Sequence, residues 1–229
     1  MVMNEYKDLW EEFYKDGKYS MGFPGEPEIK FFNRLKKERS LDGLKALDFG
    51  CGIGRNLGFM EGLGLETYGL EISEEAVNLC KERGFNVSLY DGKHIPFKDE
   101  FFDIIISFGV LDHMLFFDAF YLMHELYRIL KNEGKMLLVL HSVFDSNYTK
   151  NLKIEENIKN IKIEENTFII TREISDFEIG IPQHYFSQQD IDLLTNKFTI
   201  ERYTLHENKN FIGNLYNKDS FWELYLKKL

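Results

Sequence analysis

Three glycines at alternate positions, directly after an acidic residue, form the part of the sequence best suited to bind a ligand. The stretch LDFGCGIG, residues 47–54, places Gly50, Gly52 and Gly54 behind Asp48. Glycines between a strand and a helix let the backbone approach a ligand closely and direct free N–H groups toward it. The alternative interpretation is a tight turn that only leaves a buried strand.

The residue types in this loop distinguish two classes of cofactor. Dinucleotide-binding folds use G-x-G-x-x-G, whereas the spacing here is G-x-G-x-G, and Arg55 stands where that pattern has glycine or alanine. The carboxylate of Asp48 would repel a pyrophosphate, but it would attract a ligand that carries a sulfonium and an ammonium group. The loop therefore predicts a cationic adenosyl cofactor.

Two further carboxylates follow the next apolar runs. Glu71 comes near the end of ETYGLEI, 21 positions after Gly50, where a carboxylate can accept hydrogen bonds from both hydroxyls of a ribose. Asp91, in LYDG, can accept a hydrogen bond from the amino group of adenine. The ligand crevice of an open α/β sheet lies at the carboxyl ends of its strands, so these residues predict one site. The structural alternatives are a carboxylate that favours a helix N-terminus for Glu71 and a turn residue for Asp91.

Short apolar runs alternate with segments of helical periodicity over roughly 100 residues around these motifs. The runs predict strands at 44–50, 66–72, 86–92, 101–114 and 134–142. The periodic segments predict helices at 5–16, 28–39, 55–64, 73–83 and 118–130. Ser73 can cap the fourth of these helices. This alternation predicts a parallel sheet that helices cover on both faces.

At this point the sequence resembles the class I S-adenosylmethionine (SAM)-dependent methyltransferases. The matching stretches are ALDFGCGIGRN, YGLEIS, LYDGKHIPFKDEFFDIIISFGVLDHM and YRILKNEGKMLLVL, which cover about residues 46–142 in the motif order of that family. The resemblance implies a Rossmann-like, doubly wound, seven-stranded and mostly parallel sheet whose last strand is antiparallel. It also implies SAM as the cofactor and methyl transfer to a small-molecule acceptor by in-line displacement.

The residues expected at the cofactor come from the motifs, from the end of the fourth strand and from the turn-rich segment near residue 20. They are Tyr19, Asp48, Gly50, Cys51, Gly52, Gly54, Arg55, Glu71, Ile72, Asp91, Gly92, Ser107, Phe108 and Val110. The resemblance implies that residues 107–110 line the methyl-transfer site. The aromatic residues Tyr6, Trp10 and Tyr14 recur at helical spacing and are interpreted as core rather than as a cofactor lid.

Methyl transfer requires mainly that the protein orient the acceptor relative to the methyl group. The leaving group is good and neutral, so alignment of the acceptor and exclusion of water can supply much of the catalysis. A general base is needed only where the acceptor carries a proton that must leave early. His113 and His184 are the candidate bases, with an ordinary hydrogen-bonded histidine as the alternative for each. The sequence has no metal-ligand spacing, so no metal site is predicted.

The organisation predicted for residues 1–229 is a single domain of four parts. They are an N-terminal helical cap (1–39), a cofactor-binding core (40–142), an insertion (143–182) and the C-terminal part of the sheet (183–229). The insertion repeats KIEEN twice, which predicts a charged helix or hairpin at the surface. Ser187 can cap a helix in the last part.

Composition limits the partners and leaves two other functions open. A net charge of −10 disfavours a broad phosphate-binding face, so no nucleic-acid partner is expected. Two cysteines and the lack of a long apolar run fit a cytoplasmic protein without membrane contact. The expected assembly is a monomer or a homodimer. The alternatives are a non-catalytic module that binds the adenosyl cofactor and an NAD(P)-dependent oxidoreductase, which the glycine spacing and Asp48 disfavour.

Overall fold

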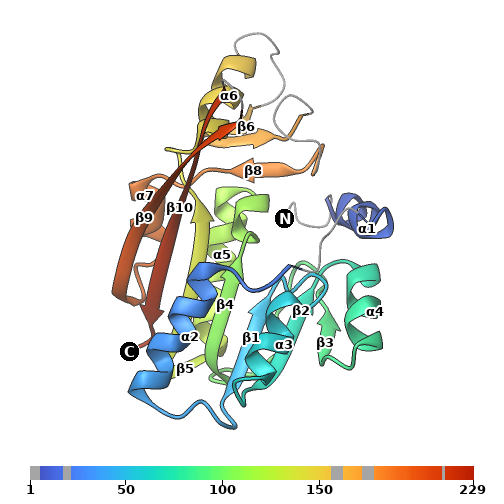
Figure 1. Cartoon of the computed structure of the whole chain (residues 1–229), viewed down its shortest axis with the longest axis vertical. Helices are drawn as coiled ribbons and strands as arrows, with labels where there is room; N and C mark the ends of the chain where they lie inside the picture. The colour runs from blue at the N-terminus through green and yellow to red at the C-terminus, as the bar shows by residue number, and fades with distance from the viewer. Residues whose placement is uncertain (1–5, 18–21, 156–161, 172–177, 213–214) are drawn as a thin grey trace.

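A computed structural model describes residues 6–17, 22–155, 162–171, 178–212 and 215–229 (Figure 1). Its centre is a seven-stranded sheet in the order β3-β2-β1-β4-β5-β10-β9. The strands of this sheet are β1 (Lys45–Phe49), β2 (Glu66–Glu71), β3 (Val87–Leu89), β4 (Phe102–Phe108), β5 (Leu130–His141), β9 (Thr199–Ile212) and β10 (Leu215–Lys227). The helices are α1 (Lys7–Lys15), α2 (Glu26–Glu38), α3 (Arg55–Glu61), α4 (Glu74–Glu82), α5 (Phe116–Ile129), α6 (Ser146–Glu155) and α7 (Gln188–Leu194).

The pairing of the strands confirms the predicted doubly wound sheet. β1 pairs in parallel with β2 and β4, β2 with β3, and β4 with β5. β10 is antiparallel to both of its neighbours, β5 and β9. The carboxyl ends of the five parallel strands therefore meet at one edge, and the switch in strand order between β1 and β4 opens the crevice there.

Helices cover both faces of the sheet, as the alternation of elements predicted. Successive residues of a strand point to opposite faces, so each strand contributes to two cores. Leu47 and Ile105 pack in one core with α5 and α7. Ala46 and Ile104 pack in a second core with α2, α3 and α4. None of the helices in the described part of the chain has the length and apolar character needed to cross a membrane.

Side-chain caps fix where two helices begin. The hydroxyl of Ser73 accepts a hydrogen bond from the N–H of Ala76, at 3.2 Å, at the start of α4. Ser187 and Asp190 form a reciprocal capping box at the start of α7. The Ser73 cap matters for the site, because it holds the start of α4 directly behind the end of β2.

A second, three-stranded sheet of β6 (Lys162–Glu164), β7 (Thr167–Ile169) and β8 (Pro182–His184) lies beyond the carboxyl ends of β4 and β5 (Figure 1). A carboxylate oxygen of Glu164 accepts a hydrogen bond from the N–H of Phe116 at 2.6 Å, which ties this sheet to the start of α5. The four-part division of the chain stays a prediction, and β8 runs across the boundary expected after residue 182.

Candidate active site

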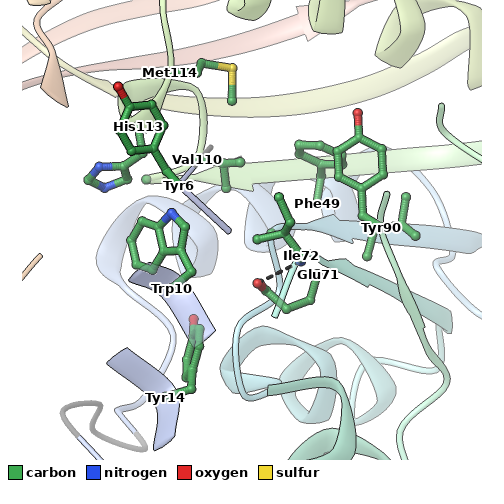
Figure 2. A pocket seen from close by; sticks show the side chains of 13 residues that line it. Tyr6, Trp10, Tyr14, Phe49, Glu71, Ile72, Tyr90, Val110, His113 and Met114 are labelled. Carbon is green, nitrogen blue, oxygen red and sulfur yellow. Dashed lines mark hydrogen bonds between the residues drawn. The ribbon is translucent and has the colours of Figure 1, made fainter. Parts of the chain in front are cut away.

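A cavity lies between α1 and the carboxyl ends of β1, β2 and β4. Figure 2 shows Trp10 and Tyr14 of α1 on one side of this space and Glu71, Ile72 and Tyr90 on the other. The space measures about 600 Å³ with its mouth included. Its lining consists of Tyr6, Trp10, Tyr14, Phe49, Gly50, Leu70, Glu71, Ile72, Tyr90, Gly109, Val110, His113 and Met114.

The glycine loop after β1 forms one end of the cavity. Gly50 and Gly52 have φ angles of 74° and 52°, in the left-handed region that favours glycine. A Cβ atom on Gly50 would lie 2.2 Å from Cγ2 of Val110, and one on Gly52 would lie 2.8 Å from the hydroxyl of Tyr14. The N–H group of Gly50 donates to the carbonyl oxygen of Leu70 at 2.8 Å. The loop is therefore tied to β2 and admits no side chain at these two positions without displacing a wall of the cavity.

Glu71 is held as a fixed carboxylate beside the loop. Its side chain is 6% exposed. One oxygen accepts the N–H of Gly52 at 2.9 Å, and the other accepts the N–H groups of Ile72 and Ser73 at 2.8 and 3.0 Å. Burial raises the pKa of Glu71, although these three bonds oppose the shift. A carboxylate can accept about four hydrogen bonds, so capacity remains for a ligand hydroxyl.

Removal of this carboxylate is expected to weaken SAM binding. Glu71→Ala should lower the binding free energy by roughly 1–3 kcal/mol, about 5–150-fold in Kd, the cost of a lost charge-assisted pair of hydrogen bonds. Calorimetric titration with SAM measures the change. Glu66→Ala is the matched control, because Glu66 lies at the other end of β2 and pairs with Lys45. Equal affinity of the wild type and a folded Glu71→Ala protein would contradict the assignment.

Asp48 lies beneath the loop and does not line the cavity. It is 2% exposed, and its Oδ2 atom has no hydrogen-bond partner among the described residues. Burial raises the pKa of Asp48 to about 7, against a smaller opposing effect of a hydrogen bond from Asn56. Arg55 does not neutralise it by an ion pair, because the guanidinium pairs with Glu28 at 2.9 Å. An unpaired buried carboxylate of this kind fits a cationic ligand.

The raised pKa of Asp48 predicts a pH dependence of stability. A carboxylate that protonates more easily in the folded chain stabilises the fold below about pH 4, and this contribution is lost as the pH rises toward 7. The loss is on the order of 4 kcal/mol for a shift of this size. Urea unfolding of the ligand-free protein should therefore show that Asp48→Asn gains stability relative to wild type between pH 5 and pH 8. A wild-type-to-variant difference that stays constant over this range would show that Asp48 is not perturbed.

Four of the predicted cofactor-binding residues line the cavity: Gly50, Glu71, Ile72 and Val110. The remaining described ones are not part of its lining: Asp48, Cys51, Gly52, Gly54, Arg55, Asp91, Gly92, Ser107 and Phe108. Tyr19 falls outside the described residues, and its contact stays a prediction. The Cys51 thiol is buried and shares the carbonyl oxygen of Gly52 with the Cys80 thiol, at 3.7 and 3.2 Å, so it packs between the loop and α4.

Asp91 forms a turn after β3. Its Oδ1 atom accepts the N–H groups of Lys93 and His94 at 2.7 and 2.8 Å, and these bonds lower its pKa. Gly92 lines a second hollow between this turn and α5, and Tyr90 lines both hollows. The turn thus uses only the Oδ1 atom of Asp91. The contact between Asp91 and adenine stays a prediction.

His113 is the candidate base that lines the cavity. It belongs to the short 3₁₀ turn Leu111–His113 after β4. Its Nδ1 atom lies 3.2 Å from the carbonyl oxygen of Pro182, and its Nε2 atom lies 3.8 Å from a carboxylate oxygen of Glu178. A carbonyl oxygen only accepts, so this bonding assigns the proton to Nδ1 and leaves Nε2 of the neutral ring able to take a proton. The edge of the ring packs on Trp10, with centroids 5.0 Å apart.

His184 lies in the small sheet, away from the lining of the cavity. It is 1% exposed, and its Nδ1 atom lies 2.6 Å from the hydroxyl of Thr167, across the β7–β8 pair. Its ring packs on Phe186 with centroids 4.4 Å apart. These contacts join β7, β8 and the main sheet, so we do not include His184 in the mechanism.

The aromatic residues of α1 are the part of the site that the sequence did not reveal. Tyr6, Trp10 and Tyr14, interpreted from their spacing as core, line the cavity. Glu11 fixes the helix in this position, since one of its oxygens accepts the Ser73 hydroxyl at 2.7 Å and the N–H of Glu75 at 3.2 Å. Helical periodicity identifies the buried face of α1 but not whether that face meets a core or a cavity.

Comparison with known proteins agrees with this architecture. Residues 47–138 match the family model described as a methyltransferase domain. An uncharacterized protein of Methanocaldococcus jannaschii is 32% identical over 145 residues, which cover 60% of each chain. A tRNA (carboxymethyluridine(34)-5-O)-methyltransferase of Xenopus tropicalis is 32% identical over 110 residues, 48% of this chain and 17% of that protein. Thus the chain spans 60% or less of the length of these two relatives.

The fold has solved counterparts. The crystal structure of a SAM-dependent methyltransferase from Methanosarcina mazei superposes with a TM-score of 0.69 at 20% identity, over 86% of this chain and 97% of that one. At this identity the likeness to the solved structure concerns the fold alone. The match to the methyltransferase-domain model, over residues 47–138, includes the glycine loop, Glu71 and the end of β4. The methyltransferase-domain match over residues 47–138 and this fold thus agree with the resemblance to the class I SAM-dependent methyltransferases.

Proposed function

We propose that this protein transfers the methyl group of SAM to a small-molecule acceptor within the cavity between α1 and the sheet. The observation that carries the proposal is the composition of the cavity wall. Gly50 of the glycine loop and the fixed carboxylate of Glu71 line one part of the cavity, where they would form an acidic cradle, and His113 lines the same cavity after β4. The two requirements of the reaction, a cofactor cradle and an acceptor position, thus meet in one space.

The residues present fit the cofactor. Glu71 would hold the ribose, and the left-handed turns of the glycine loop, which carry no side chain at Gly50 and Gly52, would let the rest of the molecule approach the backbone closely. Asp48 lies beneath the loop, and its Oδ2 atom has no partner among the described residues, so its carboxylate would act on the positive charge of the methionine end through the loop rather than by contact. When bound, SAM supplies an electrophilic methyl group on a sulfur that leaves as a neutral thioether.

The protein itself would contribute orientation, dryness and a base. Trp10 and Tyr14 of α1 cover the cavity, and their aromatic surface excludes water from the transfer site. His113, with its Nδ1 proton held by Pro182, keeps Nε2 free to take a proton from the acceptor. In-line displacement then needs only an acceptor held opposite the sulfur.

A small acceptor suits the charge of the molecule. The net charge of −10 opposes the counterion release that drives binding to a polyanion. The relative named for a tRNA methyltransferase activity is much longer than the region it shares with this chain. The cavity and its mouth, about 600 Å³ together, fall within the size range of small-molecule sites.

Incubation with SAM labelled in its methyl group distinguishes the alternatives. We expect label to pass to a compound in a low-molecular-mass cell extract and not to purified tRNA. Label on tRNA alone would overturn the small-molecule proposal. Binding of S-adenosylhomocysteine (SAH) without transfer to any extract component would favour the non-catalytic module, and binding of NADH in place of SAH would favour an oxidoreductase.

A further inference from the structure

Three carboxylates, none of them in the lining of the cavity, lie close to His113 or to His141. Glu178 lies 3.8 Å from Nε2 of His113. Asp112, directly before His113, is fully buried, and one of its oxygens accepts the N–H of His141 at 2.6 Å while the other has no hydrogen-bond partner among the described residues. Asp145 is 3% exposed and accepts the N–H of Ser220. No lysine or arginine of the described ranges forms an ion pair with any of the three.

The pKa shifts of two neighbouring groups agree with negative charge here, although His141 pairs with Asp112 at 3.4 Å and offsets the charge of that carboxylate when it is protonated. Burial alone would lower the pKa of His141, but the charge of Asp112 and a hydrogen bond to it, with smaller effects of Asp145 and Glu178, raise it to about 9. Burial also raises the pKa of Tyr14, and the charges of Glu71 and Glu178 add to the rise. The geometric link between Glu178 and the cavity is the 3.8 Å distance from its carboxylate to Nε2 of His113, which belongs to the lining.

The wall of the cavity on this side is aromatic. Tyr6 and Trp10 line it next to His113 (Figure 2), and Trp10 presents its ring to the edge of that histidine. Aromatic faces attract cations, most strongly the indole ring, and they offer nothing to an anion. A negative charge beside the lining, that of Glu178 next to His113, and the aromatic rings of Tyr6 and Trp10 within it together favour an organic cation.

We infer that the acceptor is an amine, drawn into the cavity as an ammonium ion by Glu178 and the aromatic rings of Trp10 and Tyr6. The inference rests on the proposed methyl transfer and names the chemical class of its acceptor. His113 has a defined role in this scheme, because an ammonium nitrogen has no lone pair and must lose a proton before it can attack.

The proposed reaction balances in protons and electrons. The ammonium group gives one proton to Nε2 of His113 and becomes a neutral amine. The lone pair of its nitrogen forms the new N–CH₃ bond while the S–CH₃ bond breaks and its electron pair stays on sulfur. The products are a methylated ammonium ion, neutral SAH and a protonated His113, which returns its proton to water.

Three probes of matched shape test the inference on the full chain saturated with SAH. They are 2-phenylethylamine, 2-phenylethanol and phenylacetate, titrated by calorimetry at pH 7, where the amine is protonated. We expect the amine to bind at least about tenfold more tightly than the alcohol and the carboxylate to bind least tightly. Glu178→Gln, which keeps the shape and removes the charge, should abolish this preference and leave the affinity for SAH unchanged.

Glu165→Gln is the matched control, since it removes the same charge from a 79% exposed position between β6 and β7 and should keep the amine preference. The inference is overturned if the amine fails to bind, if the alcohol or the carboxylate binds as tightly, or if Glu178→Gln keeps the preference. The SAH titration that precedes each run reports separately on the proposed function. Failure of SAH to bind would overturn that function, whereas SAH binding without amine preference would overturn only the acceptor class.

Discussion

Gly52→Val is expected to abolish SAM binding while the chain still folds. Gly52 has a φ angle of 52°, and a Cβ atom there would lie 2.8 Å from the Tyr14 hydroxyl, so a branched side chain strains the backbone and displaces the Tyr14 ring from the wall of the cavity. The same strain would displace the N–H group that Gly52 donates to Glu71. Both walls of the cradle thus depend on one missing side chain, and calorimetry should detect no binding of SAM.

Gly43→Val separates this effect from general backbone strain. Gly43 has a φ angle of 71°, and a Cβ atom there would meet no atom within 4 Å. It precedes β1, at the end of the sheet opposite the cavity. The Gly43→Val protein should lose about as much unfolding free energy as Gly52→Val, measured with urea, and should bind SAM with the affinity of the wild type. Normal SAM binding by Gly52→Val would show that the loop is not the cofactor cradle.

His113→Gln is expected to lower kcat by about 10²–10⁴-fold, the usual contribution of a general base, and to leave the affinity for SAM unchanged. Glutamine can still donate a hydrogen bond to Pro182 but cannot take up the acceptor proton at neutral pH. Single-turnover transfer of labelled methyl to the acceptor found in the extract assay measures the step directly.

His124→Gln is the control for this variant. His124 also places Nδ1 near a carbonyl oxygen, that of Phe120, at 2.9 Å, but it lies on α5 outside the lining of the cavity. Its kcat should equal that of wild type. An unchanged rate in His113→Gln would remove His113 from the chemistry and leave orientation alone as the source of catalysis.

The main sheet was predictable because its signals are local. Apolar runs that end in glycine or a carboxylate mark β1 and β2, and Ser73 and Ser187 mark the starts of α4 and α7. The parallel order follows from the alternation of these elements, since a helix must carry the chain back between parallel strands. Glu71 therefore lies at the carboxyl end of β2, in the lining of the cavity, which is where the sequence predicted it; its contact with the cofactor stays a prediction.

The acceptor side of the site was less predictable because its residues meet only through tertiary contacts. His113 and Glu178 are 65 positions apart and approach each other only because the segment before β8 crosses the end of β4. Asp112 follows β4 inside a stretch that matches the family motifs, whereas His141 ends β5 outside them, and no local signal indicates that the two residues meet. The residues of α1 have the spacing of an ordinary amphipathic helix, so the sequence pattern does not indicate whether its apolar face covers a core or a cavity.

A crystal structure of the complex with SAH tests the central claim most directly. We predict ligand density in the cavity lined by Tyr14, Gly50 and Glu71, with a ribose hydroxyl bonded to the Glu71 carboxylate and the sulfur atom facing His113. Density for the ligand outside this cavity, or a sulfur atom two or more side-chain lengths from His113, would contradict the account.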